Sequence, residues 1–229
     1  MKLTVIHTTP ATINSLGQLI HSEMPEIEVN HILDDSILGD MNAGKNVAWV
    51  RERWLEYARI ACRNGAQAVL SACSTVGEFA QEADAMLPIP VYRIDEAMAR
   101  EAVRRGGVIA VFATLASTLQ PTERLIRRLA QESGASCTIC TVLVEGAYDA
   151  LMRGDRTAHD TAIARAMARQ APGADTLVLA QASMASAAQA LNPAFRNKVL
   201  TSPLLGVRKL KEDLAGLEGE ADGTRLHRN

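Results

Sequence analysis

The chain contains two copies of one short pattern, and this repetition restricts its possible folds more than any other feature. Residues 65–75 read GAQAVLSACST, and residues 173–183 read GADTLVLAQAS. Each copy begins with an apolar run, which is followed by a small residue, one distinct side chain and two more small residues. That side chain is Cys73 in the first copy and Gln181 in the second. Both copies predict a buried strand that leads directly into a helix.

Other matches occur at nearly the same offset. Cys73 and Gln181 are 108 positions apart, as are Pro90 and Lys198, which each precede a short apolar run. The segments 8–12 and 114–118 both begin and end with threonine and lie 106 positions apart. Three coincidences at nearly one spacing indicate a duplicated unit, so we expect two similar halves related by an approximate twofold axis.

Short apolar runs alternate with longer helical patterns along the chain, which is typical of βαβ units and a parallel sheet. We therefore predict an α/β fold with an N-terminal half of residues 1–93 plus 204–229, which carries Cys73. The C-terminal half, residues 94–203, carries Gln181. Ligands of such folds bind beyond the carboxyl ends of the strands. The loops at 8–12, 73–75, 114–118 and 181–183 should therefore meet in a cleft between the halves.

Two segments lack a clear pattern. Residues 34–46 are polar and contain Gly and Asn, so we predict a long loop that covers the cleft. Residues 203–214 predict a closing helix, and from Glu218 onward the chain is rich in glycine and charge, which predicts a frayed tail.

Composition excludes several classes of partner. The net charge is −2 and aromatic residues make up 3% of the chain, which argues against nucleic-acid binding. The apolar runs are too short to span a membrane, and the N-terminus reads as a strand and not as a signal peptide. With no secretory signal before the four cysteines, we expect a cytoplasmic protein. Cys137 and Cys140 fall within a predicted strand without a second ligand pair, so we interpret them as structural thiols and expect no metal.

Cys73 is the side chain most suited to chemistry. It follows a strand and precedes a helix, where free backbone N–H groups lower a thiol pKa and can also bind a carboxylate or an oxyanion. The alternative is a small buried cysteine that only packs. The threonines of the neighbouring loops are open to two interpretations as well, because Thr12 and Thr118 could cap helices or line the cleft.

Four segments together resemble the aspartate/glutamate racemase superfamily, in particular its hydantoin racemase and arylmalonate decarboxylase branches. They are residues 72–75 (ACST), 111–118 (VFATLAST), 145–155 (EGAYDALMRGD) and 179–184 (LAQASM). The resemblance implies two pseudo-symmetric, flavodoxin-like α/β domains with the active site between them, and an enzyme that needs no cofactor. It also implies two cysteines facing each other across the substrate α-carbon, and hydroxyls and amides that hold the substrate carboxylate.

Carried onto this chain, the resemblance implies Cys73 as the first catalytic cysteine and places Gln181 at the position of the second. The substrate-binding residues that it implies are Thr8, Ser74, Thr75, Thr114, Ser117, Thr118, Ala182 and Ser183. The expected partner is a small substrate with a carboxylate, and a homo-oligomer is the default assembly.

Gln181 departs from the family pattern, because glutamine is not a base near neutral pH and acts only through hydrogen bonds. Three mechanisms remain open. Cys73 can act as a lone acid and base, Cys73 can act as a nucleophile while Gln181 orients the substrate, or Ser183 or a water can act as a weak second acid. Racemisation or isomerisation is the primary prediction. A single-cysteine decarboxylase or lyase is the alternative, and a non-catalytic carboxylate-binding protein is the second alternative.

Overall fold

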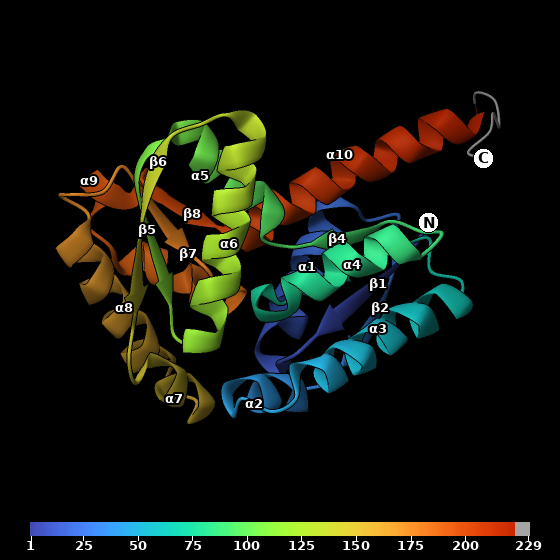
Figure 1. Ribbon diagram of the computed structural model, residues 1–229, viewed down its shortest axis with the longest axis horizontal. Coiled ribbons are helices and arrows are strands. Elements are labelled where there is room, and N and C mark those ends of the chain that lie inside the picture. The colour runs from blue at the N-terminus through green and yellow to red at the C-terminus, as the bar shows by residue number, and fades with distance from the viewer. Residues whose placement is uncertain (223–229) are drawn as a thin grey trace.

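A computed structural model describes the backbone of residues 1–222 and the side chains of residues 1–216. It contains two four-stranded sheets in which all neighbouring strands are parallel (Figure 1). The first sheet has the order β2-β1-β3-β4 and the second has the order β6-β5-β7-β8. The strands of the first sheet are β1 (Lys2–His7), β2 (Glu28–Leu33), β3 (Ala68–Ser71) and β4 (Val91–Arg93). Those of the second are β5 (Gly107–Ala113), β6 (Cys137–Leu143), β7 (Thr176–Leu179) and β8 (Val199–Thr201).

The identical strand order confirms the duplicated fold that the repeat predicts. In each sheet the strand order reverses direction at the central pair, which is β1 and β3 in the first sheet and β5 and β7 in the second. In folds of this kind a ligand binds in the crevice between the loops that follow such a pair. The loops in question follow β1, β3, β5 and β7, and they are the four segments that the sequence singles out. Where the boundary between the halves lies stays a prediction, and residues 223–229 of the predicted N-terminal half lie outside the described residues.

Helices cover both faces of each sheet, which explains why the central strands are buried along nearly their whole length. One face of the first sheet packs against α2 (Ser36–Asn42), α3 (Val47–Arg63) and α4 (Gly77–Met86), with Trp54 fully buried in this layer. The other face packs against α1 (Ile13–Glu23) and α10 (Ser202–Asp222).

The second sheet is covered in the same way. Its helices are α5 (Glu96–Arg105) and α6 (Ala116–Ser133) on one face, and α7 (Ala147–Met152) and α8 (Arg156–Gln170) on the other. The short α9 (Pro193–Arg196) precedes β8. Three 3₁₀ helices, η1 (Pro10–Thr12), η2 (Ser74–Val76) and η3 (Ala182–Ala190), follow β1, β3 and β7.

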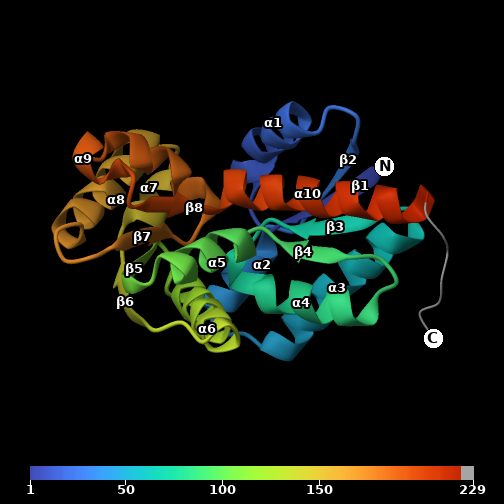
Figure 2. The same cartoon turned by 90° about the horizontal axis from the view of Figure 1, so that it is seen from above.

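The last helix joins the halves. α10 leaves the second sheet directly after β8 and runs over the first half (Figure 2), where Val207, Leu210 and Leu214 enter the core beside α1. The helix predicted for residues 203–214 therefore forms, but it continues to Asp222. The frayed tail predicted from Glu218 is wrong as far as residue 222, and the rest of it lies outside the described residues.

The loop predicted for residues 34–46 is also wrong, because residues 36–42 form α2. Its apolar residues Ile37 and Met41 lie one helical turn apart and pack into the core of the first sheet, and Leu38 is also buried. The side chain of Asp34 accepts a hydrogen bond from the Ser36 backbone N–H at 3.1 Å just before the helix, while the N-cap residue Asp35 makes no capping hydrogen bond with its side chain. The polar residues between these apolar positions hid the helix in the sequence.

Candidate active site

A small cavity of about 30 Å³, close to the volume of one water molecule, lies between the two halves. Seven of the ten predicted site residues line it, and they are Thr8, Cys73, Ser74, Thr75, Gln181, Ala182 and Ser183. Thr9, Thr12, Leu38 and Ala72 complete the lining. Cys73 and Gln181 thus share one cavity, although they come from different sheets. None of these lining residues carries a fixed charge, so an anion bound here would be held by hydroxyls, amides and backbone N–H groups.

Burial and hydrogen bonding have opposite effects on the pKa of the Cys73 thiol. Burial raises the pKa above its ordinary value of 9.0, and this effect is the largest. The Thr8 hydroxyl, the Thr75 hydroxyl and the backbone N–H groups of Thr75 and Val76 lower it by stabilising the thiolate. The net shift is upward, so the lowered pKa expected from the helix start alone is wrong. A raised pKa reduces the thiolate fraction at neutral pH but makes each thiolate a stronger base.

Gln181 has a fixed orientation. Its Oε1 accepts hydrogen bonds from the Thr114 backbone N–H at 2.6 Å and from the Thr114 hydroxyl at 2.9 Å. Because a backbone N–H can only donate, the accepting atom must be the amide oxygen and not the amide nitrogen. Both hydrogen bonds to Thr114 use the side-chain oxygen of Gln181. The side-chain NH₂ group is therefore the part of the amide that can donate to a ligand.

Two buried hydrogen bonds hold the halves together at the cavity. The Ser74 hydroxyl donates to the Ala180 carbonyl at 2.7 Å, and the hydroxyls of Thr75 and Thr118 lie 2.8 Å apart. Thr118 lies inside the first turn of α6, so its hydroxyl contacts Thr75 and does not cap the helix. Both bonds connect the loop after Cys73 to the second half, and they fix the position of that loop relative to Gln181.

Three predicted site residues do not line the cavity. Thr114 and Thr118 are one contact removed, because they hold Gln181 and Thr75 as described above. Ser117 is farther away and donates a hydrogen bond to the Asn42 side chain at 2.6 Å. Ser117 therefore joins α6 to α2 at the edge of the site.

Of the two interpretations left open for Thr12, the structure supports the one in which it lines the cavity, because Thr12 stands at the N-cap of α1 but its side chain makes no capping hydrogen bond. Thr9 caps η1 by accepting from the Ala11 N–H, while Thr12 makes no capping hydrogen bond. The Thr12 hydroxyl lies 3.3 Å from His7 Nδ1, and His7 Nε2 lies 2.9 Å from His31 Nδ1. Burial, and then the proximity of His31, lower the pKa of His7 to about 4, so His7 is a neutral buried group beside the site near neutral pH.

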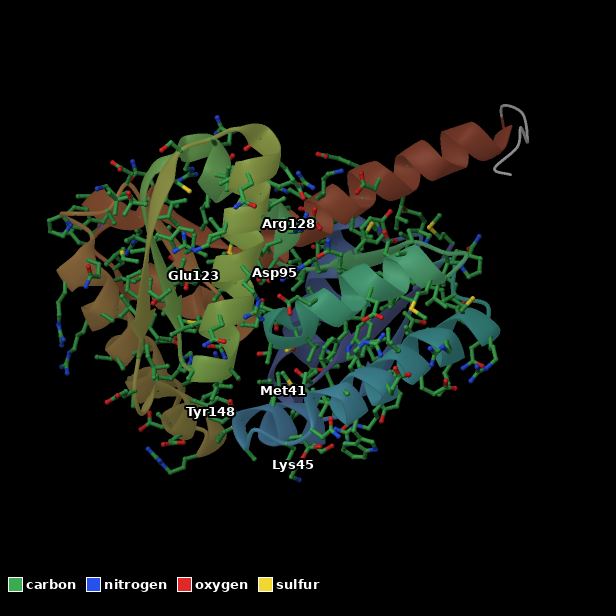
Figure 3. The ribbon with its side chains drawn as sticks, viewed as in Figure 1. Met41, Lys45, Asp95, Glu123, Arg128 and Tyr148 are labelled. Carbon is green, nitrogen blue, oxygen red and sulfur yellow. The ribbon has the colours of Figure 1, made fainter. Side chains whose placement is uncertain are left out.

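Sequence reasoning missed two residues at the site. Leu38 of α2 lines the cavity, and Tyr148 of α7 is close enough to Cys73 for the thiolate to contribute to raising its pKa. Burial is the main cause of that increase, followed by Asp149 and Asp35. Figure 3 labels Tyr148 on α7 and Met41 on α2, where the two halves approach each other. The only sequence signal for Tyr148 is its place within the segment 145–155.

Two features are absent from the described residues, a metal-ligand cluster and a helix able to span a membrane. Among the described side chains, those of residues 1–216, no three His, Cys, Asp or Glu residues are grouped as metal ligands would be. In the same part of the chain no helix has the length and apolarity needed to cross a bilayer.

Comparisons with known proteins place the fold and the family. Residues 5–210 match the family model described as Asp/Glu/Hydantoin racemase. The structure resembles glutamate racemase RacE1 from Bacillus anthracis, with a TM-score of 0.73 and 15% identity over 93% of this chain and 81% of that one. Allantoin racemase from Klebsiella pneumoniae gives a TM-score of 0.68 and 20% identity over 95% and 89%. Glutamate racemase from Francisella tularensis gives 0.76 and 12% over 100% and 84%. No curated protein matches the sequence.

Proposed function

We propose a one-thiol mechanism for this chain, which belongs to the Asp/Glu/hydantoin racemase family and is an isomerase of the racemase type. The substrate is a small acid, and the reaction is proton transfer at the carbon next to its carboxylate. The observation that carries the proposal is the shared cavity, which one thiol and one oriented amide both line.

Cys73 is the acid and base of this mechanism. Its thiolate removes the α-proton, and the electron pair moves into the neighbouring carboxylate to give an enediolate-like anion. The Thr8 and Thr75 hydroxyls and the N–H groups that stabilise the thiolate lie where they can also bind the anionic substrate. The same thiol can then return the proton, and a positioned acid or base contributes roughly 10²- to 10⁴-fold.

Gln181 stabilises charge but does not transfer the proton. Its NH₂ group donates to the carboxylate or enediolate oxygens, because its carbonyl is bound to Thr114. The proton for the opposite face must come from a water or from the Ser183 hydroxyl, both weak acids. Exchange of the α-proton should therefore be faster than inversion of the α-carbon.

A decarboxylase is the second candidate, and the fixed amide of Gln181 favours it. Loss of CO₂ from a substituted malonate leaves the same type of anion, which needs a single proton from one face. Cys73 alone can supply that proton.

The test is proton NMR in D₂O with aspartate, glutamate, substituted malonates, maleate and hydantoins. The wild type is compared with Cys73→Ala and with Cys62→Ala, a cysteine on α3 that does not line the cavity. Deuterium at the α-carbon that requires Cys73 but not Cys62 supports proton transfer, and loss of a carboxylate supports the decarboxylase. Equal exchange in the wild type and Cys73→Ala would refute the one-thiol mechanism. Binding without any turnover would favour a carboxylate-binding protein.

A further inference from the structure

Three side chains in hydrogen-bond contact connect the cavity that contains Cys73 with the protein surface. Thr12 lines the cavity, and its hydroxyl lies 3.3 Å from Nδ1 of His7. His7 is fully buried, and its Nε2 lies 2.9 Å from Nδ1 of His31. His31 is exposed and belongs to β2, the edge strand of the first sheet. A continuous row of polar atoms therefore runs from bulk water to the cavity.

The outer end of this row is open to water. The ring of His31 lies beside Gly17 of α1, where a Cβ would be 3.5 Å from His31 Nε2. Because glycine has no side chain, position 17 places nothing over this nitrogen. His31 also lines a surface groove of about 500 Å³ together with Lys2, Asn30 and Asn64. Nε2 of His31 can therefore exchange a proton with water or with a buffer.

The inner end of the row lies beside the part of the site that comes from the second half. η1, which ends at Thr12, packs against η3, which begins at Ala182. Thr12 and Ser183 both line the cavity that contains Cys73, and both also line the larger cavity next to it. A proton delivered by Thr12 therefore arrives near Ser183, where the proposed mechanism needs an acid for the face opposite Cys73.

The hydrogen bonds of the row can be satisfied in two arrangements. In the first, His31 Nδ1 donates to His7 Nε2, His7 Nδ1 donates to the Thr12 hydroxyl, and that hydroxyl donates into the cavity. In the second, the Thr12 hydroxyl donates to His7 Nδ1, and His7 Nε2 donates to His31 Nδ1. A neutral imidazole has one donor and one acceptor nitrogen, and a hydroxyl donates and accepts, so both arrangements pair every group. Burial, and then His31, lower the pKa of His7 to about 4, so this ring passes a proton on and does not retain it.

We propose that Thr12, His7 and His31 form a proton relay between bulk water and the cavity. In one inward passage, Thr12 gives its proton to the water or serine oxygen that has protonated the substrate. His7 then gives its Nδ1 proton to Thr12, His31 gives its Nδ1 proton to His7, and His31 Nε2 takes a proton from water. The first arrangement thereby becomes the second. One proton enters the row and one leaves it, and none of the three groups gains a charge.

The reverse passage completes the cycle. It carries the proton that Cys73 has taken from the substrate, through a water in the cavity, back to bulk water and restores the first arrangement. The relay rests on the proposed function, because it serves a reaction that takes up a proton at one face of the α-carbon and supplies one at the other. It also explains why a buried imidazole beside the site contacts an exposed one.

Deuterium uptake with chemical rescue tests the relay. With an acid that the wild type exchanges in D₂O, His31→Ala should take up deuterium about tenfold more slowly, because the outermost carrier is lost. Added imidazole replaces the missing ring and should restore most of this rate, while it leaves the wild-type rate unchanged. His21→Ala removes an exposed histidine of α1 and should match the wild type without imidazole.

Nitrogen-15 NMR of the histidine rings tests the relay without any substrate. The spectra are recorded at pH 8, where the lowered pKa values leave both His7 and His31 neutral. Both nitrogens of His7 should then have shifts between those of a protonated and an unprotonated ring nitrogen, because the relay needs both tautomers. A His7 ring fixed in one tautomer would overturn the inference.

Two kinetic results would also overturn it. One is deuterium uptake by His31→Ala at the wild-type rate, and the other is slow uptake that imidazole does not restore, which would assign His31 a structural role only. Failure of the proposed function gives a different result, since no acid would then exchange in the wild type. The tautomers of His7 would still decide for or against the relay in that case.

Discussion

The buried His7, which contacts the exposed His31, predicts that the protein loses stability as the pH falls from 7 to 5. His7 has a pKa of about 4 in the folded protein and an ordinary value of 6.5, so the unfolded chain binds the proton more tightly. Stability therefore decreases with decreasing pH through the window between these two values. The linkage relation with these pKa values gives a loss of about 2 kcal/mol between pH 7 and pH 5. The limit at lower pH is about 3 kcal/mol, since each pKa unit is worth about 1.4 kcal/mol.

The pH range from 7 to 5 distinguishes the contribution of His7 to stability from that of the carboxylates. Salt-bridged acids such as Glu101, whose pKa is lowered to about 2 by Arg104 and Arg105, also reduce stability in acid. Their stabilisation is lost mainly below about pH 4, where the unfolded carboxylates begin to take up protons. Between pH 7 and pH 5 the lowered histidine pKa is the larger cause, and the pKa of His31, lowered by its own burial, acts in the same direction.

Urea unfolding followed by circular dichroism at pH 7, 6 and 5 measures the effect. The variant His7→Gln lacks the titrating ring, so its free energy of unfolding should change about 2 kcal/mol less than that of the wild type over this range. His21→Gln, which removes an exposed histidine on α1, should keep the wild-type pH dependence. If the wild type and His7→Gln show the same change between pH 7 and pH 5, the burial argument for His7 is refuted.

Three further predictions follow from the site and its supports. Because the pKa of Cys73 is raised above 9.0 and the thiolate is the active base, kcat/KM for α-proton exchange should still be rising at pH 9; a plateau near pH 7 would contradict this. Thr118→Val should remove the buried hydroxyl contact with Thr75 and lower stability by about 1–2 kcal/mol, as measured by urea unfolding, whereas Thr157→Val at an exposed position should have little effect. Gly206→Ala would press a methyl group against the Ile94 carbonyl and should cost about 1–3 kcal/mol in the same assay.

The sequence was sufficient to predict how the two halves are built and which loops meet. The repeat places Cys73 and Gln181 after equivalent strands, and the rule that parallel sheets bind ligands at their carboxyl ends brings the two loops together. No comparable signal existed for α2, whose apolar residues are separated by Gly39 and Asp40. Leu38 could not be assigned to the site, because its position depends on how α2 packs on the first sheet.

The pKa of Cys73 shows a different limit of sequence reasoning. A helix start after the cysteine correctly predicts nearby N–H donors, and those donors do lower the pKa. The opposing effect is burial, which is produced by both halves closing around the thiol and has no local signature in the sequence. Thr118 is a similar case, because a threonine just before a predicted helix suggests a cap, yet the helix begins at Ala116 and the Thr118 hydroxyl bonds to Thr75 from the other half.

The duplicated fold also gives Cys73 and Gln181 equivalent surroundings. Thr8 follows β1 and acts on Cys73, and Thr114 follows the equivalent β5 and bonds to Gln181. Each half therefore has a threonine at the end of its first strand near its distinct residue, which is a thiol in one half and an amide in the other. In the proposed mechanism the substrate lies between these two polar groups, of which only the thiol can transfer a proton. It follows that proton transfer should favour the face next to Cys73, so that the ratio of α-proton exchange to inversion directly measures the asymmetry that Gln181 introduces.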